Sequence, residues 1–134
     1  MQAKEIIGLD LGTKHTGVAR ASSIAKIAEP LASLETNKVI DQLQQLIEQK
    51  PTQAIVLGLP RNLIGDDTNQ TKWVRQWATE AKKEIELPFY WQDEALTSRQ
   101  APISSYKTGD EHSKAAAIIL QDFLDTDESE RVRC

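Results

Sequence analysis

The chain has 134 residues and a mass of 15.0 kDa, with 40% hydrophobic and 27% charged residues, which is typical of one globular domain with its own core. It has no apolar run long enough for a membrane span or a signal peptide, and its one cysteine, Cys134, excludes an internal disulfide, so we expect a cytoplasmic protein. A formal net charge of -4 argues against binding nucleic acid by bulk positive charge alone, but it allows contact with phosphates through a metal and a local basic patch.

The N-terminal part of the chain predicts three strands before any helix. Residues 6–11 form a short apolar strand, and residues 16–21 form a second strand that runs back beside it after a turn at residues 12–14. Residues 27–34 are typical of a third strand, and Pro30 places its first half at an edge or a bulge. The chain therefore opens with an antiparallel unit.

Helices and strands alternate after this unit. The apolar run at residues 54–59 is continuous, which predicts a strand buried on both faces in the middle of the sheet, and residues 89–92 predict a fifth strand. Helical spacing of apolar residues predicts helices at residues 36–50, 73–85 and 111–124, and a weak helical segment, broken by Pro102, at residues 97–106.

This order predicts a three-layer α/β fold with a mixed five-stranded sheet, an antiparallel hairpin on one side and flanking helices. We expect residues 1–126 to form a single domain and residues 127–134 to form a charged, disordered tail. Functional groups in such sheets gather at the carboxyl ends of the parallel strands. Three polar clusters stand at predicted strand ends, namely Asp10, residues 60–62, and Asp93 with Glu94.

Asp10 is an acidic residue in the most hydrophobic predicted strand. Burying a carboxylate there is costly unless a cation such as a divalent metal compensates it, although Asp10 could also simply cap the turn. If Asp10 and Glu94 converge, their carboxylates would select hard cations such as Mg2+ or Mn2+. Two such ions, ~4 Å apart, activate a water and stabilise the leaving oxygen in phosphodiester cleavage. His15 and His112 have no evident nucleophile partner, so a serine or thiol mechanism is not predicted.

Four motifs resemble, in order and spacing, those of the YqgF family, the RuvX-like proteins that include proposed Holliday junction resolvases and pre-16S rRNA nucleases. The motifs are residues 8–14 with 17–19, residues 56–60 with Asn62 and Gly65, residues 93–94 with 96–97, and residues 115–121. The resemblance implies an RNase H-like fold, a cytoplasmic bacterial protein and metal-dependent trimming of the 5′ end of the small-subunit rRNA precursor. It also implies that Asp10 and Glu94 are the first two acids of a metal site.

The third acid of that site is missing. Most family members carry an aspartate at the start of the last helix, where this chain has His112. Histidine can still ligate a metal or hold a water, and Asp110 or Glu111 could substitute if the helix begins earlier. We assign Asp10, Glu94 and His112 as the catalytic and metal-binding residues, with Mg2+ or Mn2+ as the cofactor.

Phosphate contacts are expected at the hairpin turn and at the end of the central strand. Thr13, Lys14 and Asn62 are the predicted substrate-binding residues, since a loop residue held by a rigid strand end is well placed for such a contact. Ala95 stands where the family usually has an arginine, and the expected replacement for that contact is Arg99 or Arg61.

Other conspicuous residues have simpler interpretations. Trp73 and Trp77 lie four residues apart on one helix face and are predicted to belong to the core, not to a base-stacking platform. Asp66 and Asp67 are predicted to face solvent.

The predicted function is a metal-dependent nuclease that acts on structured nucleic acid. The leading prediction is 5′-end processing of pre-16S rRNA. The expected partners are precursor rRNA or branched DNA and the ribosomal precursor particle, and the chain is expected to be a monomer or a homodimer. Two alternatives stay open on the same fold, a Holliday junction resolvase and a non-catalytic RNA-binding or ribosome-binding module. A phosphate-binding fragment of an actin-like ATPase is a third, but the chain is too short for the two lobes of that class.

Overall fold

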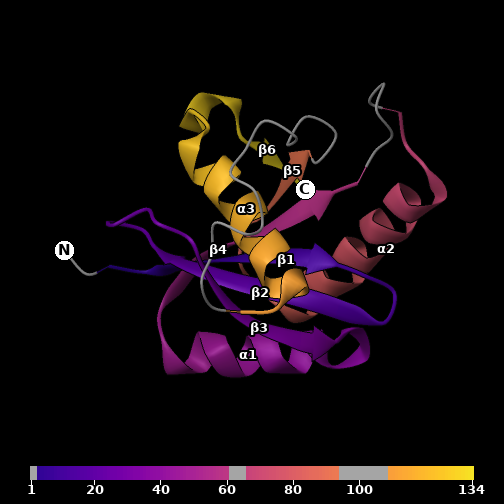
Figure 1. The fold of residues 1–134 in the computed structure, drawn as a ribbon, viewed down its shortest axis with the longest axis horizontal. Helices are drawn as coiled ribbons and strands as arrows, with labels where there is room; N and C mark the ends of the chain where they lie inside the picture. The colour runs from indigo at the N-terminus through magenta and orange to yellow at the C-terminus, as the bar shows by residue number, and fades with distance from the viewer. Residues whose placement is uncertain (1–2, 61–65, 94–108) are drawn as a thin grey trace.

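The computed structural model of the protein describes residues 3–60, 66–93 and 109–134. They form a six-stranded sheet with the order β3-β2-β1-β4-β5-β6 (Figure 1). The first three strands pair antiparallel, β1, β4 and β5 run parallel, and β6 returns antiparallel to β5. The strands are β1 (Glu5–Leu11), β2 (His15–Ser22), β3 (Glu29–Glu35), β4 (Thr52–Leu59), β5 (Phe89–Asp93) and β6 (Val132–Arg133).

Helices cover both faces of this sheet. On one face lie α1 (Val39–Gln49) and α2 (Asn69–Glu84), and on the other lies α3 (Glu111–Asp125) (Figure 1). A 3-10 turn, η1 (Thr36–Lys38), leads into α1, and Thr68 caps the start of α2 with a capping box. The predicted three-layer α/β architecture is confirmed, and the weak segment predicted at residues 97–106 lies outside the described residues.

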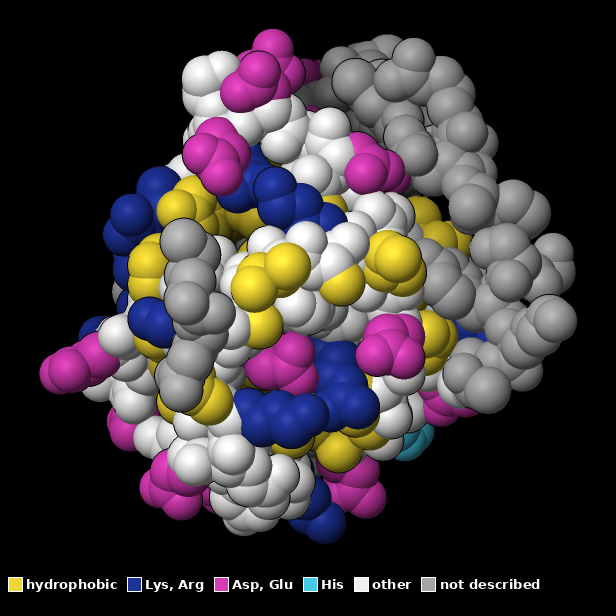
Figure 2. Space-filling model, turned by 90° about the vertical axis from the view of Figure 1, so that its left-hand side faces the viewer, with side chains coloured by type: hydrophobic (Ala, Val, Ile, Leu, Met, Phe, Trp, Pro, Cys, Tyr) yellow, Lys and Arg dark blue, Asp and Glu magenta, His cyan; other side chains and the backbone are white. Residues whose placement is uncertain are grey.

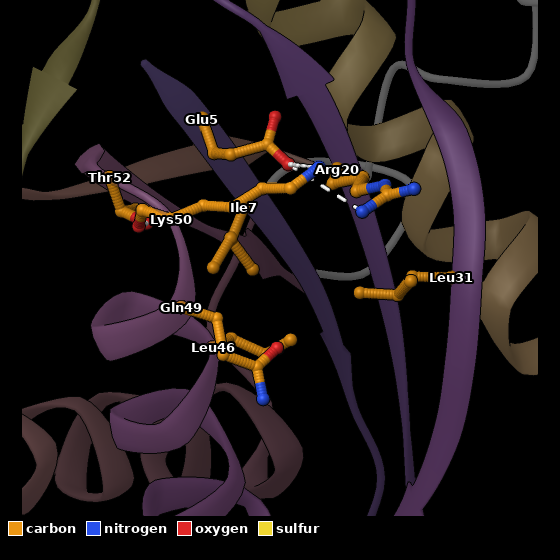
Figure 3. Close-up of a pocket in the computed structure, with 8 residues that line it drawn as sticks. All are labelled: Glu5, Ile7, Arg20, Leu31, Leu46, Gln49, Lys50 and Thr52. Atoms are coloured by element: carbon orange, nitrogen blue, oxygen red, sulfur yellow. Dashed lines mark hydrogen bonds and ion pairs between the residues drawn. The ribbon is translucent and has the colours of Figure 1, made fainter.

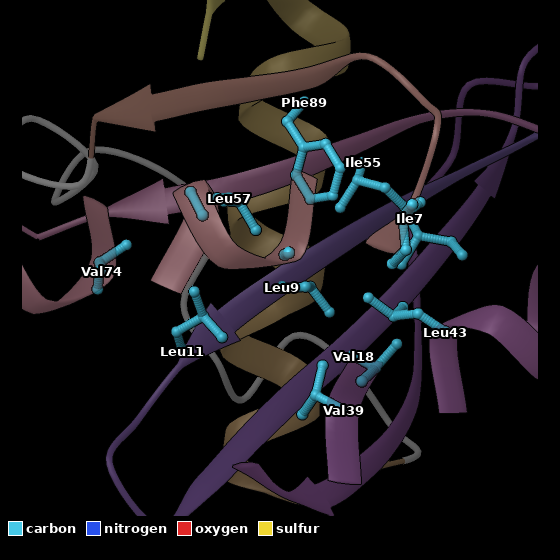
Figure 4. Packing of buried hydrophobic residues seen from close by; sticks show 13 residues of the cluster. Ile7, Leu9, Leu11, Val18, Val39, Leu43, Ile55, Leu57, Val74 and Phe89 are labelled. Carbon is cyan, nitrogen blue, oxygen red and sulfur yellow. The ribbon is translucent and has the colours of Figure 1, made fainter. Parts of the chain in front are cut away.

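Strand β4 joins the two halves of the core, as its unbroken apolar sequence predicts. Ile55 and Leu57 pack with α1 and α2 on one face (Figure 4), whereas Val56 packs with α3 on the other. All three side chains have no solvent-exposed surface. Because both faces are covered, the parallel strands are rigidly held and their carboxyl ends form a fixed platform.

The prediction for the C-terminal tail is wrong, and with it the number of strands. Residues 127–134 contain a 3-10 turn, η4 (Glu128–Glu130), and then β6, which makes the sheet six-stranded. The Cys134 backbone N–H donates to the Phe89 carbonyl at 2.9 Å. The Arg131 guanidinium lies 4.3 Å from the centre of the Phe123 ring. A free edge of β5 offers unpaired backbone groups, and the tail satisfies them despite its charged sequence.

The sheet end at which β1 begins is closed by an ion-pair cluster. Glu5 lies 3.7 Å from the Arg20 guanidinium and 4.0 Å from the Lys50 ammonium, over a cavity of about 40 Å³ (Figure 3). A space of that size admits water but no larger ligand. The ion-pair cluster therefore has a structural role.

Smaller predictions are confirmed as well. Trp73 and Trp77 are partly buried against the core, and the Asp67 carboxylate is partly exposed, 3.2 Å from the Arg75 guanidinium.

None of the helices in the described residues is both long enough and apolar enough to span a bilayer.

Candidate active site at the carboxyl ends of the strands

Asp10 is held near the end of β1, opposite Gly17 of β2 in the hairpin register. Because side chains alternate along a strand, Asp10 shares the α3 face of the sheet with Gly8, whose Cα faces Leu120 of α3. Burial raises the pKa of the Asp10 carboxyl above its ordinary value, and the nearby His112 imidazole partly offsets this rise in pKa. Among the described residues, no hydrogen bond or ion pair satisfies this carboxylate. A half-buried acid that has no partner in the described part of the chain fits a site for a cation.

Gly17 allows the first turn of α3 to approach the sheet. A Cβ placed there would collide with the carbonyl group of His112 and would lie 2.9 Å from the Ser113 nitrogen. These are backbone atoms of the helix, which cannot rotate out of the way. The glycine therefore sets the helix start directly against the strand pair that carries Asp10.

Asp110 caps the start of α3. Its side chain accepts the Ser113 N–H at 2.9 Å, and this hydrogen bond lowers the pKa of the Asp110 carboxyl. The Ser113 hydroxyl donates in turn to the Asp110 carbonyl at 3.1 Å. Of the residues considered for the third position of the site, His112 is the one with an electrostatic effect on Asp10.

His15 is a member of the site that sequence reasoning missed. It begins β2, and its ring stacks on that of His112 with 5.8 Å between ring centroids and 26° between planes. The signal was available in the hairpin register, because His15 lies two residues before Gly17 and so on the same face of β2. Together with Asp10, the two imidazoles form the described part of the site.

Thr13 and Lys14 lie exposed at the turn between β1 and β2. Thr36, which follows β3, holds the turn in place. Its hydroxyl donates to the Gly12 carbonyl at 2.6 Å, and its N–H donates to the Lys14 carbonyl at 2.9 Å. An open depression of about 370 Å³ adjoins the turn, lined by Thr13, Lys14, His15, Glu35 and Asn37. This surface brings a hydroxyl and an ammonium next to the histidine pair.

The rest of the predicted site lies outside the described residues. Glu94 and Asn62 are among these positions, as are Arg61, Ala95 and Arg99. Strand β5 ends at Asp93, which is level with Leu59 at the end of β4. Within residues 3–60, 66–93 and 109–134, no three His, Cys, Asp or Glu side chains are grouped closely enough to hold a metal. Asp10 and His112 therefore form only part of the predicted ligand set.

One face of the molecule carries charges of both signs side by side. On the face shown in Figure 2, Lys and Arg side chains stand in separate groups beside Asp and Glu side chains. A polyanion would find no extended positive surface on this side.

The fold places the chain among RNase H-like α/β proteins of the RuvC type. Thermus thermophilus RuvC superposes with a TM-score of 0.68 and 14% identity over 98% of this chain and 99% of that one, in a structure with a Holliday junction substrate. A second structure of Thermus thermophilus RuvC gives a TM-score of 0.64 at 12% identity. At this level of identity, the likeness concerns the fold alone.

The chain belongs to the RuvX family. The family model described as "RuvX: Holliday junction resolvase" matches residues 4–126. A protein of Gloeothece citriformis is 36% identical over 137 residues, covering 94% of this chain and 91% of the relative. A protein of Rickettsia felis is also 36% identical, covering 90% and 86%. Both relatives carry the name "Putative pre-16S rRNA nuclease".

Proposed function

We propose that this RuvX-family protein is a nuclease that hydrolyses phosphodiester bonds and trims the 5′ end of the 16S rRNA precursor. The observation that carries the proposal is the half-buried Asp10 carboxylate, without a protein partner among the described residues and next to His112 at the end of the sheet. The names of the relatives from Gloeothece citriformis and Rickettsia felis favour precursor rRNA as the substrate.

Asp10 and His112, with Glu94, would hold Mg2+ or Mn2+. When bound, such ions activate a water and stabilise the oxygen that leaves the phosphorus. The donor set combines one imidazole with carboxylates, and carboxylates suit both Mg2+ and Mn2+. Either ion is therefore proposed as the cofactor.

The remaining residues would bind and orient the substrate. The Lys14 ammonium and the Thr13 hydroxyl lie exposed beside the histidine pair, where they can donate to phosphate oxygens of the bound strand. Asn62 is proposed as a further contact. The chain has a formal net charge of -4, so binding would depend on local contacts and not on net charge.

A Holliday junction resolvase is the second candidate function. It is favoured by the description of the family model and by the RuvC structure solved with a junction. A non-catalytic RNA-binding module is the third candidate, because His112 replaces the acid usual in the family.

The test is cleavage of two labelled substrates, a precursor 16S 5′ leader and a four-way DNA junction, with Mn2+ or Mg2+. Wild-type protein is expected to trim the leader, and Asp10→Asn is expected to abolish the trimming while binding is retained. Cleavage of the junction alone would favour the resolvase. Binding of RNA without cleavage by the wild-type protein would overturn the nuclease proposal.

A further inference from the structure

The turn between β2 and β3 presents two isoleucines to solvent. Ile24 is 60% exposed and Ile27 is 69% exposed, and of the large apolar side chains described only Val132 is comparably exposed, at 57%. Apolar side chains of this size are costly to leave in water, and the two lie three residues apart on one turn. We call residues 22–28, which carry them, the knob.

The knob has a fixed shape. The Ser22 hydroxyl accepts the Ile24 N–H at 3.1 Å, and the Ser22 carbonyl accepts the Lys26 N–H at 2.9 Å. Gln121 of α3 braces the other side, since it accepts the Ala28 N–H at 2.8 Å and donates to the Lys26 carbonyl at 3.2 Å. A turn held by this many hydrogen bonds loses little conformational entropy on binding.

The knob also carries positive charge. Lys26, which stands between the two isoleucines in the sequence, is exposed. The Lys4 carbonyl accepts the Ser23 N–H at 2.8 Å, and the Lys4 N–H donates to the Ser23 hydroxyl at 3.0 Å. Glu29 follows the knob and opposes this charge in part. The knob is therefore an apolar tip with a basic margin.

An open groove of about 430 Å³ lies between the C-terminal ends of α1 and α2. Its apolar lining comes from Ile47, Ile85 and Leu87, and its polar lining comes from Gln44, Glu48, Glu84 and Glu86. The three glutamates are exposed, and no ion pair neutralises them within the described residues. The lysines closest in sequence have other partners, since Lys82 donates to the Cys134 carbonyl and Lys83 pairs with Glu80.

The groove and the knob match in chemistry. One is apolar with an acidic rim, and the other is apolar with a basic margin. A nucleic acid is excluded as occupant of the groove, because its phosphates would be repelled by three uncompensated carboxylates.

Both features lie at the same end of the sheet. Glu5 is level with Ser22, where the knob begins, and its N–H donates to the Pro51 carbonyl just after α1 at 2.8 Å. The end of α2 leads into β5, which is parallel to β4, so it reaches the same end. A twofold axis at this end can therefore place the knob of each copy in the groove of the other.

We propose that a second copy of this chain is the occupant, so that two copies associate through reciprocal knob-in-groove contacts. The carboxyl ends of β1 and β4 lie at the opposite end of the sheet, so the candidate active sites would face away from the interface and stay accessible. The proposal does not depend on the nuclease activity.

The test is sedimentation velocity over a range of protein concentrations. Wild-type protein is expected to show a monomer–dimer equilibrium, and I24S/I27S is expected to raise the dissociation constant by about tenfold, which corresponds to about 1.4 kcal/mol. Val132→Ser removes an exposed apolar side chain elsewhere and is expected to leave the equilibrium unchanged. Equal effects of the two variants, or a wild-type monomer at every concentration, would overturn the proposal.

Reversing the charges of the knob and of the groove distinguishes reciprocal docking from non-specific association. K26E and E48K/E86K are each expected to sediment as monomers, because both contacts in either homodimer would join like charges. Mixed together, they are expected to form a heterodimer, since one contact is native and the other is reversed in sign on both sides. A mixture that stays monomeric would contradict the assignment of the knob to the groove.

Discussion

Substitution of Gly17 by alanine tests whether this glycine positions the first turn of α3 over the site. The new Cβ would overlap the His112 carbonyl group and approach the Ser113 nitrogen to 2.9 Å. Overpacking of this kind costs about 1–3 kcal/mol, and we expect the upper part of that range because backbone atoms form the obstacle. The displaced helix would carry His112 away from Asp10, so activity should fall along with stability.

Gly8→Ala is the matched control for this prediction. Its Cβ would meet the Leu120 Cβ at 2.7 Å, which lies on the same helix but two turns beyond His112. Urea denaturation should therefore give a loss of unfolding free energy for both variants, and the loss should be larger in Gly17→Ala, where backbone atoms form the obstacle. Cleavage of the precursor leader, measured well below the unfolding midpoint, should fall sharply only in Gly17→Ala. A Gly17→Ala variant with the stability and activity of the wild type would refute this reasoning.

Three further predictions concern His15, Asp122 and Arg131. His15→Ala should lower cleavage about threefold to tenfold. His15→Phe should retain more activity, because phenylalanine can still stack on His112. An equal loss of activity in the two variants would exclude stacking as the role of His15. Burial raises the pKa of the Asp122 carboxyl to about 6, so the folded state holds this proton more tightly than the unfolded state. The free energy of unfolding should therefore fall by about 1–3 kcal/mol between about pH 4 and pH 7, and urea titrations should show that Asp122→Asn lacks this component. Arg131→Ala should cost about 0.5–2 kcal/mol in the same titrations, since its guanidinium lies over Phe123; unchanged stability would mean that the tail contributes nothing.

The architecture could be predicted because local and global signals agree along most of the chain. The unbroken apolar run of β4 indicated a strand covered on both faces, and Ile55 and Val56 do face opposite halves of the core. The position of Asp10 near the end of the first strand followed from the same pattern. The spacing of apolar residues was sufficient to predict these elements, because the burial of one or both faces of an element determines that spacing.

The parts that failed depend on contacts between distant segments. Residues 127–134 have the composition of a disordered tail, but they pair with the edge of β5. The local sequence of the tail does not predict this pairing. His15 was judged by its sequence neighbours, whereas its partner His112 lies on the last helix. The capping bond of Asp110 to Ser113 could not be predicted either, because it depends on where α3 begins.

The most direct test of the proposed metal centre is a titration of the isotope-labelled protein with Mn2+, followed by NMR. The paramagnetic ion should broaden the imidazole signals of His112 well before one equivalent is added, and excess Mg2+ should reverse the effect. Asp10→Asn should require a much higher Mn2+ concentration for the same broadening. If the His112 signals stay sharp, or broaden equally in Asp10→Asn, then Asp10 and His112 do not share a metal and the proposed centre is wrong.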